Sequence, residues 1–550
     1  MSEYETAGLP RKIPARRGFY VEYKGKPLIS RIDPERQAER IAASLPVKER
    51  TLYICPSPLL GYGIAGFIKK MPASSALFCV EADKTLYEWT LQNTSCSLFD
   101  TPYTAFAYCD NAAAACRAVR EKWGMRQFRR VEPLNLSGGY ALFRDLYEEF
   151  ISTLHRTFAI EWSNAITLTR LGRLYIRNLI RNLPAFETSP SISDIDFGSN
   201  PVLVAGAGPS LDNFLDAVNT QNPPIIIAVD TALAALQSRG ITPALVIALE
   251  AQHWNLDDFV GWGGTDIPLA MDMSALNAHA RFAGGMPYFF STPWTELKIF
   301  SRLHAANLLP PVFPPLGSVG LCAVALALRT TRGPIIVCGL DFSFTIDNYH
   351  ARGTPTSRAA QRRCTRFGGL YHTAAIFREG SLQTVSKSKT PVRTDPAMKH
   401  YRSLFEEEFS KIPRIFDIEG SGLSLGTRTL RINEALSILK QRALQNSPKQ
   451  PKSNIPRGGS AAEFLENERK TLAELRGILT EGGSIERLDT LIDEADYIWA
   501  HFPDCAGAGG QRPPCSDTIF LKRLRAELDS FIALIDTTIR YSAADIDKGY

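Results

Sequence analysis

The chain has 550 residues, which is too long for a single hydrophobic core, so we expect about three domains. Its hydrophobic content of 45%, charged content of 22% and net charge of +5 are ordinary for a globular protein of this length. Composition therefore gives no argument for a nucleic-acid or membrane partner, and we expect neither. The sequence shows no signal-peptide segment, no apolar run of about twenty residues and no CxxC pair, which predicts a cytoplasmic protein with reduced thiols.

The first region, residues 1–137, follows the order of a Rossmann-like fold. The segment TLYIC predicts a strand, a turn with Gly61 and Gly63 leads into a helix, and ALFCVEAD predicts a second strand with acids at its end. We expect a small α/β domain here. The glycine turn could contact a ligand or could only need small residues, and the sequence leaves this open.

Residues 138–200 predict a helical bridge followed by a linker, because apolar positions recur at helical spacing before a stretch rich in Ser and Asp. We place the central domain at 201–445 and a Pro-, Ser- and Lys-rich linker at 446–460. Residues 461–550 read as a helical C-terminal domain, a type of element often used for packing or oligomerisation, so a homo-oligomer is among the expected assemblies.

In the central domain, continuous apolar strands alternate with helices. The segments VLVAGAG, IIIAVD, ALVIALE and PIIVCGLDF predict strands, and LDNFLDAV, TALAALQSRG and SVGLCAVALALRTT predict the helices between them. This alternation is typical of a parallel sheet covered on both faces. We therefore expect an α/β protein whose central domain is doubly wound.

The turn GAGPSL is the first candidate site. Its glycines would let the backbone approach a phosphate, and the helix that follows would supply amide groups and a positive dipole end. Such a turn also occurs for structural reasons alone. The candidate phosphate contacts are Gly206, Ala207, Gly208, Pro209, Ser210 and Leu211.

Three acids stand at predicted carboxyl ends of strands: Asp230, which Thr231 follows, Glu250 and Asp341. Because the carboxyl ends of parallel strands share one edge, we expect them to gather near the glycine turn. A single acid at such a position is often only a helix N-cap.

Two further features belong to this edge. Gly317 and Ser318 precede a long apolar helix, where Ser318 could cap the helix, contact an anion, or do both. His350 lies nine residues past Asp341 and is the candidate general base. The stretch 351–399 has ten Lys or Arg and two acids, which fits a solvated loop or an anion-binding lid.

The motifs GAGPSL, AVDTAL, TPALVIALE, LGSVGLCAVALAL, CGLDFSF and YHARG follow the order of the MptE-like domain. The layout resembles the motility-associated factor (Maf) flagellin glycosyltransferases and is distantly similar to bacterial α/β sialyltransferases. The resemblance implies an inverting glycosyltransferase that moves a pseudaminic- or legionaminic-type nonulosonic acid from a CMP-sugar to Ser or Thr of flagellin. By that resemblance the GAGPS turn and Ser318 contact the nucleotide phosphate, and His350 takes the acceptor proton.

The sequence departs from the sialyltransferase pattern, because Ala207, Asp230 and Glu250 stand where those enzymes have asparagines. Strand-end acids suit Mg²⁺ chemistry, which keeps an alternative open: an MptE-like 6-hydroxymethylpterin diphosphokinase that uses ATP and Mg²⁺. The third hypothesis is a non-catalytic, nucleotide-binding flagellar assembly factor. No cofactor is predicted for the transferase, and the sequence alone does not identify a metal ligand.

Overall fold

The computed structural model describes residues 9–262, 265, 267–282, 287–292, 297–370, 373–378, 380–441, 460–507 and 512–546. The predicted linker at 446–460 lies outside the described residues except for Ser460, which caps the next helix. The chain divides into two compact units: residues 1–170 with 499–514, and residues 171–498 with 515–550. Across the described parts of the chain, no helix has both the length and the apolarity needed to cross a bilayer.

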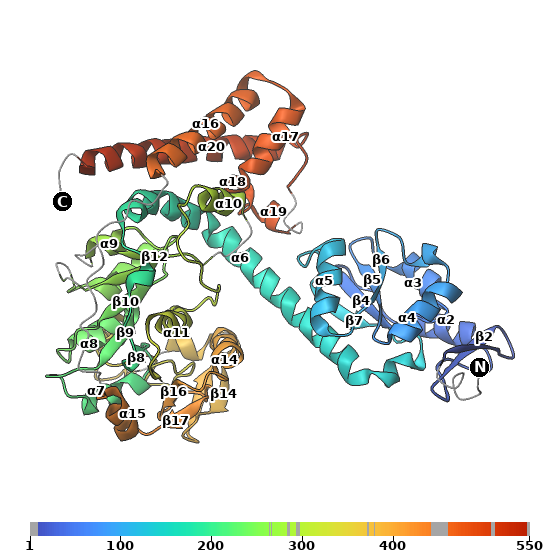
Figure 1. The fold of residues 1–550 in the computed structure, drawn as a ribbon, viewed down its shortest axis with the longest axis horizontal. Helices are drawn as coiled ribbons and strands as arrows, with labels where there is room; N and C mark the ends of the chain where they lie inside the picture. Colours follow the sequence, from blue (N-terminus) through green and yellow to red (C-terminus); the bar gives the residue numbers. More distant parts are fainter. Residues whose placement is uncertain are drawn as a thin grey trace. The chain divides into compact units, whose positions relative to one another are not determined.

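The first unit is built on a four-stranded parallel sheet (Figure 1). Its strands lie in the order β6 (Thr104–Tyr108), β5 (Ala76–Glu81), β4 (Thr51–Pro56), β7 (Arg130–Pro133). All residues of β4 and β5 are buried, which explains why both segments are almost wholly apolar. Around the sheet lie α2 (Pro34–Ser44), α3 (Ile64–Lys70), α4 (Lys84–Asn93) and α5 (Ala112–Trp123), with a small antiparallel sheet of β1 (Arg11–Pro14), β2 (Phe19–Tyr23) and β3 (Lys26–Pro27). The unit also includes α19 (Pro503–Gly507).

Helix α6 (Arg144–Thr188) begins in the first unit and ends in the second. The second unit contains an eight-stranded sheet in which every neighbouring pair is parallel. Its order is β12 (Tyr288–Phe290), β11 (Leu269–Asp272), β10 (Leu245–Ala248), β9 (Ile225–Val229), β8 (Val202–Ala205), β13 (Ile335–Cys338), β16 (Ile415–Ile418), β17 (Arg428–Leu430).

The sheet is covered by helices whose apolar residues form the main core of this unit. Helix α11 (Val319–Thr330) contacts β8, β9, β10 and β13, and nearly all of its side chains are buried, which accounts for its long apolar run. The other elements are α7 (Ser210–Ala217), α8 (Leu233–Gln237), α9 (Ala278–Phe282), α10 (Lys298–Ala305), α12 (Pro355–Arg362), α13 (Thr373–Ile376), β14 (Leu382–Val385), β15 (Pro391–Thr394), α14 (Pro396–Phe409) and α15 (Ile432–Leu439).

The C-terminal region is helical, as predicted, with α16 (Ala461–Glu481), α17 (Ile485–Glu494), α18 (Asp496–Trp499) and α20 (Thr518–Ile546). Helices α16 and α20 pack side by side. Glu468 on α16 accepts two hydrogen bonds from Arg302 on α10, at 2.6 and 2.9 Å, and one from the Tyr497 hydroxyl at 3.0 Å. The predicted fold class is therefore confirmed: a Rossmann-like domain, a doubly wound domain with a parallel sheet, and a helical C-terminal region.

Candidate functional site

The sheet of the second unit has a topological switch point between β8 and β13. From β8 the chain adds β9, β10, β11 and β12 on one side, and then returns to place β13 on the other side of β8. Ligands of open parallel sheets bind outside the carboxyl ends of the strands at such a point. The turns after β8 and β13 meet there and line a cavity of about 250 Å³.

The glycines at this point are needed because the two turns touch through their backbones. A Cβ atom on Gly206 would overlap the carbonyl oxygen of Gly339, and a Cβ atom on Gly339, whose φ is +76°, would overlap that of Gly206. A Cβ atom on Gly208 would lie 2.6 Å from Asp341 Oδ2. The turn therefore has a structural reason for its glycines, independent of any ligand.

Amide groups of the GAGPS turn are already engaged within the protein. The Gly208 N–H donates to the Gly339 carbonyl at 2.8 Å, and the Ser210 N–H donates to Asp341 Oδ2 at 2.7 Å. The Ser210 hydroxyl accepts the Gly339 N–H at 3.0 Å, and both Ser210 and Leu211 are buried. A protein carboxylate thus lies at the first amide of α7, where the sequence predicts a phosphate. Phosphate contact by residues 206–211 stays a prediction.

Asp341 connects the turn to the cavity. Its carboxyl group is 3% exposed, it lines the cavity, and its Oδ1 has no hydrogen-bond partner among the described residues. Burial raises the pKa of Asp341, while the hydrogen bonds from Ser210 act in the opposite direction. Asp341 therefore fixes the glycine turn through one oxygen and keeps the other unpaired.

The start of helix α11, where the sequence predicts an anion contact, lies at the same edge. Ser318 is its N-cap residue, as predicted, but its side chain makes no capping hydrogen bond. Gly317 has φ +66°, and a Cβ atom on it would lie 3.4 Å from the Tyr401 ring. A Cβ atom on Gly320 would overlap Leu340. Because Tyr401 and Leu340 both line the cavity, the N-terminus of α11 adjoins it.

His350 lies on the cavity wall, as predicted, beside Tyr349, whose ring centroid is 4.7 Å away. The next residue, Ala351, donates its N–H to the Ala207 carbonyl at 2.8 Å, which joins the histidine loop to the glycine turn. Three other residues of the wall were not singled out as site residues: Arg378 and Asp395, which lie in the basic stretch 351–399, and Tyr401, which lies on α14. Arg378 donates to Asp395 at 2.5 Å.

The predicted strand-end acids Asp230 and Glu250 do not line this cavity. Asp230 is buried after β9 and lies close to Asp258, which the sequence did not indicate; Asn255 Nδ2 lies 3.3 Å from Asp230 Oδ2 and 3.4 Å from Asp258 Oδ2. Burial, and next the charge of Asp258, raise the pKa of Asp230 to about 7, and burial raises the pKa of Asp258 to about 6. Thr231 donates to both carboxyl groups.

Helix α6 fixes the loops at this edge through two asparagines four residues apart. Asn178 Nδ2 donates to the carbonyls of Ala251 and Ser274, and Asn182 Nδ2 donates to those of Met273 and Ala275. A further strand-end acid, Asp272, accepts hydrogen bonds from Ser274 and Thr292 and is buried. Its only signal in the sequence is its position after an apolar run.

No group of three His, Cys, Asp or Glu side chains within the described ranges forms a metal site. Asp230 and Asp258 make a pair of carboxyl groups, and burial first, then the charge of neighbouring carboxylates, raises the pKa of each. Mg²⁺ prefers ionised oxygen ligands, so both carboxyl groups would have to lose their protons before this pair could bind the ion.

In the first unit, the glycine turn after β4 is packed against protein atoms. A Cβ atom on Gly63 would lie 2.8 Å from the Ala38 carbonyl oxygen, and one on Gly61 would lie 3.0 Å from Thr94 Cγ2. The strand-end acid Glu81 is buried and accepts hydrogen bonds from Ser57, Tyr147 and two backbone amides. These contacts favour the structural interpretation of this turn.

Comparisons with known proteins add three findings. A family model described as "6-hydroxymethylpterin diphosphokinase MptE-like" matches residues 177–347. An "Uncharacterized protein" of Treponema pallidum (strain Nichols) is 31% identical over 556 residues, which cover 96% of this chain and 95% of that protein. The solved structure of a Maf glycosyltransferase from Magnetospirillum magneticum AMB-1 matches with a TM-score of 0.54 and 14% identity, over 98% of this chain and 93% of that chain. The predicted likeness to an MptE-like domain and to the Maf fold is confirmed.

Proposed function

We propose that this chain, which belongs to one family with its Treponema pallidum relative, is a glycosyltransferase, because its fold resembles that of a Maf glycosyltransferase and residues 177–347 match the MptE-like model. The proposed reaction transfers a nonulosonic acid of the pseudaminic or legionaminic type from a CMP donor to a Ser or Thr hydroxyl of flagellin, with inversion. The observation that carries this proposal is the cavity at the switch point, which His350 shares with the turns after β8 and β13.

His350 is the proposed general base. The acceptor oxygen forms a bond to the anomeric carbon of the donor as the bond from that carbon to the CMP phosphate breaks. The hydroxyl proton passes to His350, and CMP leaves with the electron pair. A positioned base contributes about 10²- to 10⁴-fold to such a step.

The phosphate of the leaving CMP is proposed to lie at the N-terminus of α11. The Ser318 side chain makes no capping bond there, and a helix N-terminus favours an anion. The amides of Gly208 and Ser210 are taken by protein acceptors, so we give the glycine turn the role of shaping the cavity wall. Negative charge that develops on the phosphate is stabilised most where donors already point at it.

The position of Arg378 favours a donor sugar that carries a negative charge. Arg378 is a cation on the cavity wall, and its fork of N–H donors exceeds what its two partners, the Asp395 carboxylate and the Tyr349 hydroxyl, can accept. A nonulosonic acid carries a carboxylate beside its anomeric carbon. We propose that Arg378 binds that carboxylate, which would favour acidic over neutral sugar donors.

The test is a transfer assay with purified flagellin and CMP-nonulosonic acid donors, with release of CMP and flagellin mass as readouts. We expect His350→Asn to lower turnover by about 10²-fold or more while CMP affinity stays within about threefold. His304→Asn, the same change at an exposed histidine of α10 outside the cavity, is the matched control and should keep the wild-type activity. Transfer by His350→Asn at the wild-type rate would remove His350 from the mechanism, and binding of CMP without any transfer would favour a non-catalytic assembly factor.

A pterin diphosphokinase is the second candidate, and one observation favours it. Asp230 and Asp258 bring two carboxyl groups together at the carboxyl edge, as phosphoryl transfer with Mg²⁺ often requires. This candidate predicts that ATP with Mg²⁺ binds and that an Asp230→Asn, Asp258→Asn double variant loses ATP binding. The transferase predicts that the same variant still binds CMP.

A further inference from the structure

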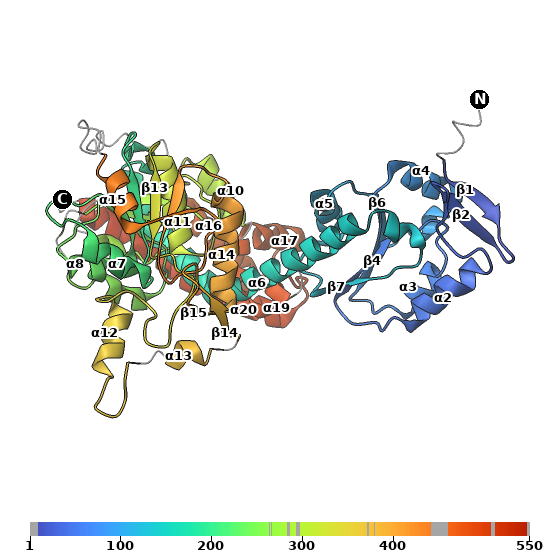
Figure 2. The same ribbon diagram turned by 90° about the horizontal axis from the view of Figure 1, so that it is seen from below.

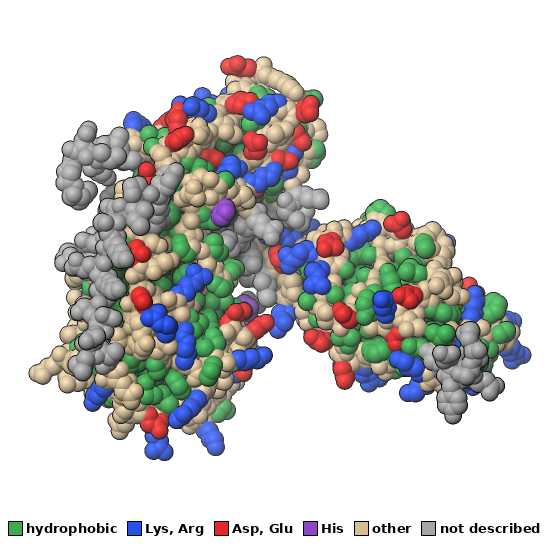
Figure 3. Space-filling view, viewed as in Figure 1, with side chains coloured by type: hydrophobic (Ala, Val, Ile, Leu, Met, Phe, Trp, Pro, Cys, Tyr) green, Lys and Arg blue, Asp and Glu red, His purple; other side chains and the backbone are tan. Residues whose placement is uncertain are grey.

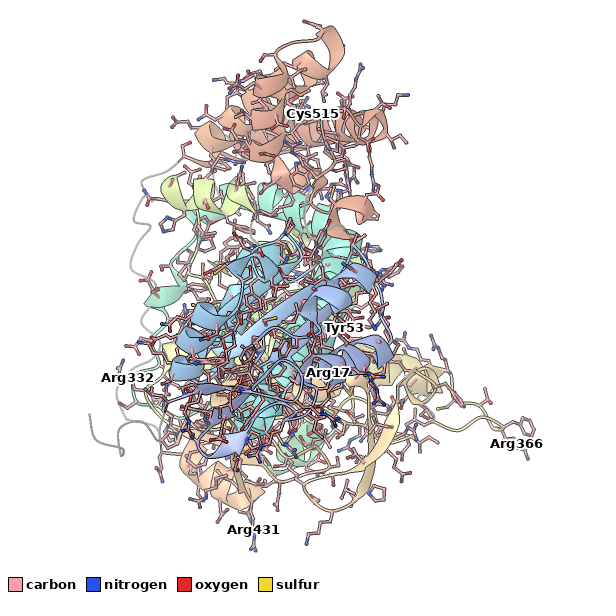
Figure 4. The ribbon with its side chains drawn as sticks, turned by 90° about the vertical axis from the view of Figure 1, so that its right-hand side faces the viewer. Arg17, Tyr53, Arg332, Arg366, Arg431 and Cys515 are labelled. Carbon is pink, nitrogen blue, oxygen red and sulfur yellow. The ribbon has the colours of Figure 1, made fainter. Side chains whose placement is uncertain are left out.

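An arm of residues 351–370 projects from the second unit. It starts directly after His350, continues into α12 and ends in a loop that Figure 2 shows extending away from the sheet. Figure 4 places Arg366 at the far end of this projection. The sequence predicts that the basic stretch 351–399 is a solvated loop or an anion-binding lid, and the structure divides that stretch: Arg378 lines the cavity, whereas Arg366 lies away from it.

The base of the arm is fixed to the site. The Arg352 N–H donates to both carboxyl oxygens of Asp212 on α7, and its guanidinium group donates to Asp216 at 2.6 Å. Gly353 has φ +91° and packs against α8, where a Cβ atom would lie 3.0 Å from Ser238 Oγ. The orientation of the arm is therefore set by α7, which follows the GAGPS turn, and by α8.

The arm carries charge of one sign. It has five arginines and no acid. All five are exposed, and no carboxylate among the described residues lies within 4 Å of four of them: Arg358, Arg362, Arg363 and Arg366. By contrast, Figure 3 shows Lys, Arg, Asp and Glu side chains interspersed over α16 and α17. Unpaired arginines of one sign on a projecting element are available for an anionic partner.

The tip of the arm adds an exposed aromatic side chain. The Thr365 N–H donates to the Gly368 carbonyl at 2.9 Å, and this turn places Arg366 and Phe367 at its apex. Phe367 is 96% exposed, and Phe377, which follows the arm, is 84% exposed. Arginine and large aromatic residues are the types that carry most binding energy in protein interfaces.

We propose that the arm is the docking surface for an acidic face of the protein acceptor. The guanidinium groups would pair with its carboxylates, and Phe367 would enter an apolar pocket within that face. A protein fits better than a lipid surface, because membrane-bound helices present a continuous apolar stripe and α12 presents mainly polar and basic side chains. The identity of the partner as the acceptor rests on the proposed function, whereas its acidic chemistry does not.

The test compares a charge-reversed arm with a matched reversal elsewhere in the unit. The arm variant is Arg362→Glu, Arg363→Glu, Arg366→Glu, and the control is Lys522→Glu, Arg525→Glu, Arg540→Glu on the exposed face of α20. The first probe is labelled poly-L-glutamate at low ionic strength, which needs no activity. We expect the arm variant to bind it at least tenfold more weakly than the wild type, and the control to bind it within about twofold.

The second measurement is transfer to intact flagellin against transfer to a short peptide with one acceptor Ser. The arm variant and Phe367→Ala should raise KM for flagellin about tenfold or more and leave kcat with the peptide unchanged. Equal binding of polyglutamate by all variants would overturn the proposal, as would stronger binding of phosphatidylserine vesicles or RNA than of polyglutamate at equal charge. Absence of transfer by the wild type would instead refute the glycosyltransferase, with the polyglutamate result still deciding the arm.

Discussion

Ser210→Ala tests whether the glycine turn is held by the protein or shaped for a ligand. The Ser210 hydroxyl accepts the Gly339 N–H at 3.0 Å, and both residues are buried. Alanine would leave that amide without an acceptor. A buried donor left unsatisfied costs about 1–3 kcal/mol, so we expect the free energy of unfolding to fall by that amount. The N–H of residue 210 would still donate to Asp341, so the turn should remain assembled.

The assay is urea unfolding, with CMP affinity measured on the same variants by calorimetry. Ser437→Ala is the control, because this hydroxyl is exposed on α15 and donates only to the Asn433 carbonyl one turn earlier. Such surface changes stay within about 0.5 kcal/mol. If Ser210→Ala kept wild-type stability but lost CMP affinity by tenfold, Ser210 would contact the nucleotide directly and the structural interpretation of the turn would be wrong.

Three further predictions follow from the site and the packing around it. The pKa of Asp230 is raised to about 7, so between pH 4 and 7 the folded protein holds a proton that the unfolded chain releases, and stability falls as pH rises through this window. Asp230→Asn should remove about 2–3 kcal/mol of that fall between pH 5 and 8. The measurement is the free energy of unfolding in urea against pH, and the same dependence on pH in the variant as in the wild type would contradict the prediction. Arg378→Gln should raise KM for the acidic donor about tenfold with CMP affinity kept, and an unchanged KM would remove Arg378 from donor binding. Glu468→Ala leaves Arg302 without its carboxylate partner and with only the Glu494 carbonyl, and should cost about 2 kcal/mol or more in urea unfolding. The exposed first-turn Glu463→Ala should cost at most about 1 kcal/mol, and equal costs would show that the ion pair contributes nothing.

The sequence predicts this architecture because its strands are buried on both faces and therefore read as unbroken apolar runs. It also places His350 at the carboxyl edge correctly, since that position depends only on where the preceding strand ends. The contact between Gly206 and Gly339 could not be predicted, because it depends on β8 and β13 being neighbours. The Ser210–Asp341 hydrogen bond joins residues 131 positions apart and depends on the same strand order.

Residues that come from outside the sheet were missed for a similar reason. Arg378 lies in the basic stretch 351–399, but the sequence does not say which of its ten cations reaches the cavity; Tyr401 lies on α14, and where that helix packs depends on the tertiary fold. Asp258 meets Asp230 only because the chain after β10 turns back across the end of β9. Which of several strand-end acids lines a cavity is decided by loop geometry, so Asp341 and Asp230 look equivalent in the sequence and differ in the structure.

The most direct test of the central claim is calorimetric titration of the wild-type protein with CMP and, separately, with ATP and Mg²⁺. A CMP-sugar transferase with its cavity at the switch point should bind CMP at one site per chain and bind ATP at least tenfold more weakly. Ser318→Val should weaken CMP binding, because it replaces the hydroxyl at the start of α11, which makes no capping hydrogen bond, by a bulkier apolar group. Tighter binding of ATP with Mg²⁺ than of CMP would contradict the proposed glycosyltransferase and favour the diphosphokinase.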